Sequence, residues 1–257
     1  MLSRFLPIRR DPPAVAPARV PDGRRVYAVG DIHGRCDLLD RLLAQIRNDG
    51  ALRGTAATTL VFLGDYVDRG PDSAAVIERL RRFAAEPDTD AHLLAGNHEE
   101  VFQLALAGET RATRLFCRIG GRETALSYGL APDEYEQLSH TELSARLQAL
   151  VPATHRDFLD ALEDVVVIGD YAFVHAGIRP GRPLEAQRRE DLRWIREPFL
   201  DHRGRLEKVV VHGHTISAQV EMLTHRIGID TGGFQTGRLT ALGLEGEDRW
   251  TLQTDSD

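Results

Sequence analysis

The 257-residue sequence contains only two cysteines, Cys36 and Cys117, which excludes a disulfide framework or a cysteine-rich zinc site. It also lacks any apolar run near the roughly 18 residues that a membrane-spanning helix requires. A basic excess is absent as well, because the formal net charge is −7. That balance argues against nonspecific binding to nucleic acid or to an anionic membrane. We therefore expect a globular protein with no nucleic-acid partner and no membrane span, cytoplasmic by default.

The first 24 residues are interrupted by prolines at positions 7, 12, 13, 17 and 21. These prolines break any signal-peptide core, and no clear cleavage site follows them. We expect residues 1–24 to form a flexible lead-in and residues 25–257 to form the domain. A basic membrane-surface patch is the alternative for this segment, because several arginines lie close together, namely Arg4, Arg9, Arg10 and Arg19.

The domain begins with short apolar runs that alternate with helical patterns. The runs predict buried strands at 26–29, 60–63, 92–95, 165–168, 172–174 and 209–211. Leucines at helical spacing predict one helix from residue 36 to a stop at Gly50 and another over 73–83. Residues 108–164 are mostly helical in pattern and more polar, which predicts an inserted helical lobe. The alternation of strands and helices predicts an α/β fold with a largely parallel start to its sheet.

Polar side chains of the metal-ligand type follow five of these apolar runs. They stand in GDIHG (30–34), GDYVDRG (64–70), GNHEE (96–100), FVHAG (173–177) and VVVHGHT (209–215). In open α/β sheets, ligands bind in the crevice at the carboxyl ends of the strands. If the chain stays extended past Gly30, Asp31 and His33 also point to the same side. Together these segments predict a site for divalent cations.

In these segments and in their order, the sequence resembles the PPP-type metallophosphatases, which include bacterial and phage serine/threonine protein phosphatases. The resemblance spans roughly residues 25 to 243 and implies a β-sandwich of two mixed sheets flanked by helices, with the helical insert at 108–164. It implies two divalent metal ions, with Mn²⁺ expected and Fe²⁺ or Zn²⁺ as alternatives. A hydroxide held between the two ions would attack phosphorus in line.

The resemblance also assigns metal ligands in this sequence. They are Asp31, His33, Asp65, Asn97, His175 and His214, with Asp65 bridging the two ions. The family pattern uses the histidine that precedes a threonine, as His214 precedes Thr215, so we expect His212 to be a neighbouring strand residue. The loop that begins at Asp230 is either close to the site or an ordinary glycine-rich turn.

Four further residues receive catalytic roles from the resemblance. His98 would be the general acid that protonates the leaving alkoxide, and Asp68 would orient its ring and favour its charged form. Arg69 suits a phosphate clamp, because a guanidinium binds two phosphate oxygens in a fork. Arg196, in the segment WIREP (194–198), resembles the second arginine of phage and bacterial members.

The predicted activity is metal-dependent hydrolysis of phosphomonoesters, with phosphoserine or phosphothreonine proteins as the expected substrates. The alternative is a phosphorylated small molecule, either a dinucleoside tetraphosphate or another nucleotide. We prefer the protein substrate because diadenosine tetraphosphatases tend to depart from GDxVDRG at its Asp-Arg pair, whereas this chain keeps Asp68 and Arg69. An inactive binding protein on the same fold should have lost ligands, and all six ligand positions are filled.

Overall fold

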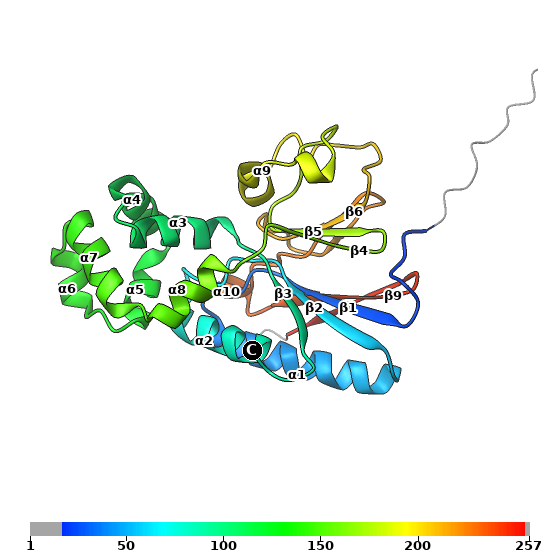
Figure 1. The fold of residues 1–257 in the computed structure, drawn as a ribbon, viewed down its shortest axis with the longest axis horizontal. Helices are drawn as coiled ribbons and strands as arrows, with labels where there is room; N and C mark the ends of the chain where they lie inside the picture. The colour runs from blue at the N-terminus through cyan, green and yellow to red at the C-terminus, as the bar shows by residue number, and fades with distance from the viewer. Residues whose placement is uncertain (1–16, 255–257) are drawn as a thin grey trace, which may run out of the picture.

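The computed structural model describes residues 17–254, and their apolar runs form two five-stranded sheets (Figure 1). The strands of the first sheet are β1 (Arg24–Val29), β2 (Ala57–Phe62), β3 (Asp90–Leu93), β9 (Thr240–Glu245) and β10 (Asp248–Gln253). Those of the second sheet are β4 (Val165–Ile168), β5 (Tyr171–Val174), β6 (Val209–His212), β7 (Glu221–Met222) and β8 (Arg226–Gly228).

Both sheets are mixed. In the first, with the order β10-β9-β1-β2-β3, strands β1, β2 and β3 are parallel, while β9 is antiparallel to both of its neighbours, β1 and β10. In the second, with the order β4-β5-β6-β8-β7, strands β5, β6 and β8 are parallel and the edge strands β4 and β7 are antiparallel. The predicted sandwich of two mixed sheets flanked by helices is confirmed.

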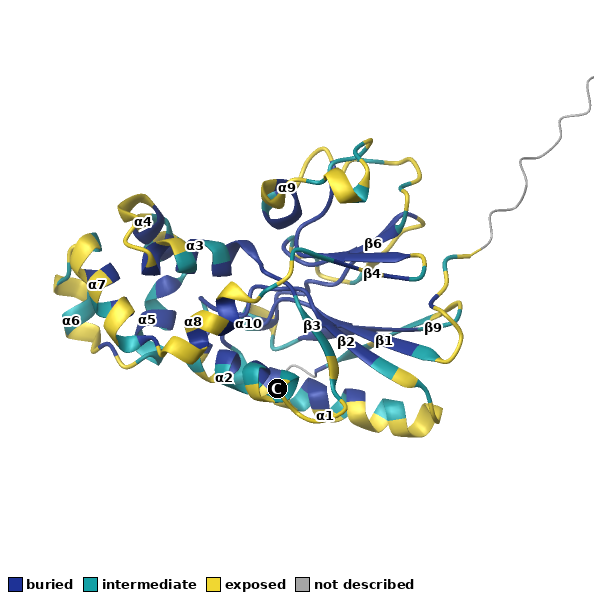
Figure 2. Ribbon diagram, in the orientation of Figure 1, coloured by how far each residue is buried: buried dark blue, intermediate teal, exposed yellow. Residues whose placement is uncertain are grey.

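Side chains of β1 alternate between two hydrophobic layers. Val26 and Ala28 belong to the cluster between the sheets, where they meet residues of the second sheet such as Phe173. Tyr27 and Val29 belong to the cluster that includes the helices on the other face. Figure 2 shows β1 and β2 buried along most of their length. Because β1 is covered on both faces, its sequence is a continuous apolar run.

Helices α1 (Cys36–Arg53) and α2 (Ser73–Ala84) cover the outer face of the first sheet, and α9 (Arg189–Trp194) covers part of the second (Figure 1). A short 3₁₀ helix, η1 (Leu184–Ala186), precedes α9. The predicted stop of α1 at Gly50 is wrong, because the left-handed backbone that ends the helix belongs to Gly54, with φ of 86°. Gly50 stays helical and its carbonyl accepts a hydrogen bond from Arg25 Nη1 at 3.0 Å. Tertiary contacts thus override the cost of about 1 kcal/mol for a glycine inside a helix.

Between β3 and β4 the chain forms a helical lobe, which projects from one side of the sandwich (Figure 1). Its helices are α3 (Asn97–Leu106), α4 (Thr110–Ile119), α5 (Gly121–Ser127), α6 (Pro132–Gln137), α7 (His140–Leu150) and α8 (Ala153–Asp160). Phe102 and Phe116 stack inside the lobe with their ring centroids 5.4 Å apart. Both rings belong to the same buried cluster as Tyr27 of β1. The lobe therefore shares a core with the first sheet.

Residues 17–23 lie against the turns of both sheets. Val20 is fully buried, and its N–H donates to the carbonyl of Gly246 at 2.9 Å. The N–H of Arg19 donates to the Asp170 carboxylate at 3.0 Å. The predicted flexible lead-in falls on residues 1–24, of which 1–16 lie outside the described residues. Within residues 17–254, no helix is both long enough and apolar enough to cross a bilayer.

Candidate functional site

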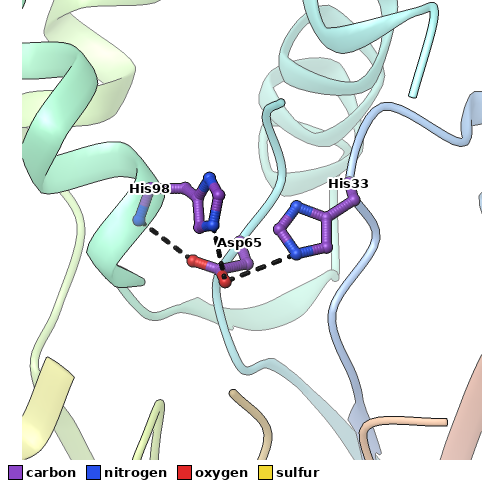
Figure 3. A group of neighbouring side chains, drawn as sticks. All are labelled: His33, Asp65 and His98. Carbon is purple, nitrogen blue, oxygen red and sulfur yellow. Dashed lines mark hydrogen bonds and ion pairs between the residues drawn. The ribbon is translucent and has the colours of Figure 1, made fainter. Parts of the chain in front are cut away.

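Asp65, in the loop after β2, is shared by two groups of side chains, and Figure 3 shows the one that it forms with His33 and His98. Its carboxylate oxygens are 3.5 Å from His33 Nε2 and 3.4 Å from His175 Nε2. His98 Nε2 lies 3.9 Å away. Within the described residues, His33, Asp65 and His98 form one group that could hold a metal ion, and Asp65, His175 and His214 form another. In each group the ligand atoms lie within 4.8 Å of one another.

Two of these histidines have their proton placed by a main-chain carbonyl. His33 Nδ1 lies 2.8 Å from the carbonyl oxygen of Val67, and His175 Nδ1 lies 2.8 Å from that of Leu63. A carbonyl only accepts hydrogen bonds, so Nδ1 carries the proton and Nε2 presents a lone pair. His33 Nε2 is buried without a hydrogen-bond partner. Imidazoles held in this way are ready to bind a cation.

Acceptor atoms converge around His175. Its Nε2 is 3.1 Å from Asn97 Oδ1 and 3.4 Å from Asp65 Oδ1. The same nitrogen is 3.2 Å from His214 Nδ1, while His214 Nε2 is buried without a partner. Because lone pairs that face one another repel unless a cation lies between them, the donor set of this group fits a divalent metal ion.

Burial favours the uncharged form of three histidines in these groups, namely His33, His175 and His214. Burial is the main cause that lowers the pKa of His33 to about 3. Burial, followed by the neighbouring His175, likewise lowers the pKa of His214 to about 3. For Asp65, burial alone would raise the pKa of the carboxyl, but the surrounding histidines outweigh it and hold that pKa well below its usual range. A carboxylate surrounded by neutral imidazoles is the charge state that metal binding needs.

The main chain that carries Asp31 to the site has a different conformation from the expected one. Strand β1 ends at Val29, and His33 has φ of 46°, so the segment turns instead of continuing as a strand. The turn is fixed because the N–H groups of Ile32 and His33 both donate to the carbonyl of Asp65, at 3.0 and 2.8 Å. The strand-alternation argument was therefore wrong, although both side chains do approach Asp65.

The Asp31 carboxylate stands outside both close groups. It accepts the N–H of His214, with Oδ2 at 3.0 Å. Burial, followed by the charges of Asp230 and Asp65, raises the pKa of Asp31 well above its usual range. Three buried carboxyl groups in one place repel one another, which a cation would relieve.

His98 has a different partner. Its Nδ1 lies 2.7 Å from a carboxylate oxygen of the fully buried Asp68, and its Nε2 lies 3.1 Å from Arg69 Nη2. Burial lowers the pKa of His98, but the negative charges of Asp65 and Asp68 outweigh it, and the net shift is upward. An imidazole with a raised pKa suits proton transfer better than metal ligation.

Left-handed backbone gathers at the site. Of the six non-glycine residues with this conformation in residues 17–254, all but Asp88 belong to it: His33, Asp65, Asp68, Arg69 and His214, with φ between 46° and 71°. Each such residue costs on the order of 1–3 kcal/mol and persists only where its surroundings hold it.

Glu99 holds part of this strained backbone, and no role had been predicted for it. Its fully buried carboxylate accepts the N–H groups of Asp65 and Tyr66 at 2.8 and 2.7 Å, and that of Gly96 at 2.9 Å. A glutamate three residues after a helix cap is the sequence signal that could have identified it. Glu99 therefore fixes the loop that carries Asp65 against the start of α3.

The loop that begins at Asp230 lies at the site, which decides between the two interpretations that the sequence left open. It leads into a short helix, α10 (Gly233–Thr236). The Phe234 ring lies 5.2 Å from that of His33, and the Arg69 guanidinium lies 4.8 Å from the Phe234 ring centroid. No pattern in the sequence indicated Phe234.

Arg196 and His212, the two other residues discussed from the sequence, lie in different parts of the structure. Arg196 is exposed in the loop after α9, and its charge is among those that lower the pKa of His214. Trp194 ties this loop to α3, because its Nε1–H donates to Glu100 at 2.8 Å. His212 lies elsewhere, with its ring 5.0 Å from that of Phe199.

Comparisons with known proteins identify a matching family and several similar proteins. The family model for calcineurin-like phosphoesterases matches residues 24–239. The symmetrical bis(5′-nucleosyl)-tetraphosphatase of Acidovorax sp. (strain JS42) is 34% identical over 185 residues, which cover 72% of this chain and 51% of that protein. The chain thus spans about half the length of that relative.

Two further proteins are similar over more of their length. The asymmetrical bis(5′-nucleosyl)-tetraphosphatase PrpE of Anoxybacillus flavithermus (strain DSM 21510 / WK1) is 26% identical over 235 residues, covering 83% of this chain and 88% of that protein. A crystal structure of a protein proposed to be a diadenosine tetraphosphatase superposes with a TM-score of 0.61 at 22% identity. It covers 95% of this chain and 100% of its own, and at that identity the likeness concerns the fold.

Proposed function

Because this chain belongs to the calcineurin-like phosphoesterase family, we propose that it is a metal-dependent hydrolase of dinucleoside polyphosphates, with bis(5′-nucleosyl) tetraphosphates as the substrate class. The observation that carries this proposal is that relatives similar over 72% and 83% of this chain are tetraphosphatases of the symmetrical and the asymmetrical kind. The earlier preference for a protein substrate depended on Asp68 and Arg69 alone. The symmetrical and asymmetrical tetraphosphatases therefore favour a dinucleoside tetraphosphate, which was the alternative substrate in the sequence analysis.

The residues around Asp65 would hold two divalent cations. His33 and Asp31 would bind one of them, and Asn97, His175 and His214 the other, with Asp65 shared, as the converging acceptors and partnerless ring nitrogens support. When bound, the cations would polarise the phosphoryl oxygens and lower the pKa of a water molecule toward about 7. Mn²⁺ is the ion that we would test first.

The chain itself supplies the groups that bind the phosphate and move the proton. Arg69 and Arg196 would each offer a guanidinium fork to phosphate oxygens. When a phosphate oxygen takes the Arg69 N–H that now faces His98 Nε2, that nitrogen becomes available to carry a proton. His98 would give this proton to the leaving oxygen while Asp68 keeps Nδ1–H in place.

A phosphomonoester is the second candidate substrate, and one observation favours it. The buried Asp68–His98 pair is suited to protonating a poor leaving group such as the alkoxide of serine or threonine. A nucleotide leaving group departs as a stabilised phosphate anion and needs that proton less. Phosphoserine or phosphothreonine proteins therefore remain the second proposal.

A side-by-side assay tests the two candidates. The purified protein with Mn²⁺ receives diadenosine tetraphosphate, a phosphoserine peptide and a phosphotyrosine peptide, and kcat/KM is compared. We expect the tetraphosphate to be preferred at least about tenfold, a difference of 1.4 kcal/mol in transition-state stabilisation. Two ADP molecules, or ATP with AMP, would identify the bond that is cleaved. Faster turnover of either peptide would overturn the first proposal, and no metal-dependent hydrolysis of any substrate would overturn both.

A further inference from the structure

Helix α5 of the lobe contacts the Asp68–His98 pair through the side chain of Thr124. Thr124 of α5 donates its hydroxyl hydrogen to Asp68 Oδ1 at 2.7 Å, and its oxygen accepts the N–H of Asp68 at 2.8 Å. The other carboxylate oxygen of Asp68 lies 2.7 Å from His98 Nδ1. Thr124 and Asp68 are both fully buried, so these hydrogen bonds are shielded from bulk solvent.

Thr124 also helps to hold the strained main chain of Asp68. Asp68 has φ of 71°, a conformation that persists only where its surroundings hold it. Ser73 helps, since its Oγ accepts the same N–H at 3.0 Å and lies 3.0 Å from Thr124 Oγ1. Of the two hydroxyls, however, Thr124 is the one that binds the Asp68 carboxylate as well as its main chain.

The close approach of α5 depends on the glycine before it. Gly120 has φ of 114°, and its carbonyl accepts the N–H of Arg69 at 3.0 Å. A Cβ atom at this position would overlap the main chain and side chain of Arg69. The α4–α5 junction of the lobe is therefore packed directly on the Asp68–Arg69 dipeptide.

We propose that Thr124 is a positioning residue for proton donation, which fixes the Asp68 carboxylate so that His98 faces the leaving oxygen. This inference rests on the role proposed for His98. By this account helix α5 of the lobe takes part in the reaction through Asp68, although it contributes no residue to either cation group. Removing the Thr124 hydroxyl leaves one carboxylate oxygen of Asp68 buried and unpaired, which frees the carboxylate to turn away from His98.

The test compares Thr124→Val, which keeps the shape and loses the hydroxyl, with Thr124→Ser, which keeps the hydroxyl. Phenyl phosphate and p-nitrophenyl phosphate are similar in shape, but phenolate is the poorer leaving group. We expect Thr124→Val to lower kcat for phenyl phosphate about ten- to one-hundredfold, part of the 10²–10⁴ typical of general acid catalysis. For p-nitrophenyl phosphate the loss should stay within about threefold, KM should not change, and Thr124→Ser should restore kcat.

The matched control is Thr113→Val. Thr113 is equally buried in the lobe, but its hydroxyl donates to the carbonyl of Glu109, the residue that caps its own helix. Thr113→Val should leave kcat unchanged for both phenyl phosphate and p-nitrophenyl phosphate. Equal losses on both substrates for Thr124→Val, or no rescue by Thr124→Ser, would overturn the positioning role.

A second readout needs no metal and no substrate. The Nδ1–H proton of His98, shielded from water and bonded to a carboxylate, should give a slowly exchanging downfield NMR signal in the metal-free protein. Thr124→Val should move or broaden that signal, whereas Thr113→Val should not; an unchanged signal contradicts the inference. If His98→Asn slows hydrolysis of both aryl phosphates equally, the proposed acid role of His98 is wrong. The NMR measurement still tests separately whether Thr124 positions Asp68 and His98.

Discussion

Two kinds of histidine meet at Asp65, and they differ in what Nδ1 binds. His33 and His175 donate Nδ1–H to main-chain carbonyls, whereas His98 donates to the carboxylate of Asp68. A carbonyl is neutral and leaves the ring uncharged, with a lone pair on Nε2. A carboxylate stabilises the charged ring, with a proton on Nε2.

The consequence is opposite chemistry in neighbouring rings. The centroids of His33 and His98 are only 4.6 Å apart. Burial lowers the pKa of His33 to about 3, whereas Asp65 and Asp68 outweigh burial at His98 and raise its pKa. The comparison teaches that two rings at similar distances from Asp65 differ in how readily they take up a proton, because only His98 has a carboxylate partner for Nδ1.

Removing Asp65 should have the largest effect, because it is common to both groups. We expect Asp65→Asn to reduce metal content below one ion per chain and hydrolysis to background, since an amide offers one neutral acceptor where a carboxylate offers two charged oxygens. Metal analysis after gel filtration and the rate of p-nitrophenyl phosphate hydrolysis measure this. Asp88→Asn is the control, because Asp88 is exposed and has a similar backbone, with φ of 63°. Full activity in Asp65→Asn would refute the shared-ligand assignment.

Replacing one histidine of each kind sharpens the comparison. His98→Asn should keep both metal ions and slow turnover about 10²–10⁴-fold for poor leaving groups, with a smaller loss for p-nitrophenyl phosphate. His214→Asn should weaken metal binding and slow all substrates together, with partial rescue by excess Mn²⁺. The measurements are kcat for each substrate and its dependence on Mn²⁺ concentration. The same substrate dependence and the same rescue in both variants would show that His98 is a ligand and not an acid.

The smallest effect is expected where a ring supports Arg69. Phe234→Leu removes the aromatic face beneath the guanidinium, an interaction worth about 0.5–1 kcal/mol at exposed sites. KM should rise about two- to fivefold with kcat unchanged, because Arg69 would be less well placed to bind phosphate. Phe83→Leu is the matched control, since Phe83 lies under Arg79 at 5.7 Å in another part of the molecule. A change in kcat alone would refute this role for Phe234.

Much of the fold and the approach of the candidate residues could be predicted because both depend on local sequence. A buried strand followed within a few residues by Asp, His or Asn places that side chain near the carboxyl end of the strand, as happens at Asp65 and Asn97. The partners of those side chains could not be predicted. Thr124 and Phe234 meet the site only through the packing of segments more than 50 residues away in sequence. The choice between the two candidate substrates could not be made from Asp68 and Arg69 for a related reason, since a dipeptide that would bind phosphate and orient an acid serves more than one phosphate ester.

The contact between Gly120 and Arg69 has a consequence for engineering. A helical insertion between two strands looks like a module that could be exchanged for that of a relative to alter substrate choice. Here the junction of α4 and α5 could not be exchanged freely, because any side chain at position 120 would collide with Arg69, and loss of the hydroxyl at 124 would release Asp68. A successful graft would retain residues 120–124 and vary the outer helices α6 and α7. The lobe thus has one part that must be kept and another that could be exchanged.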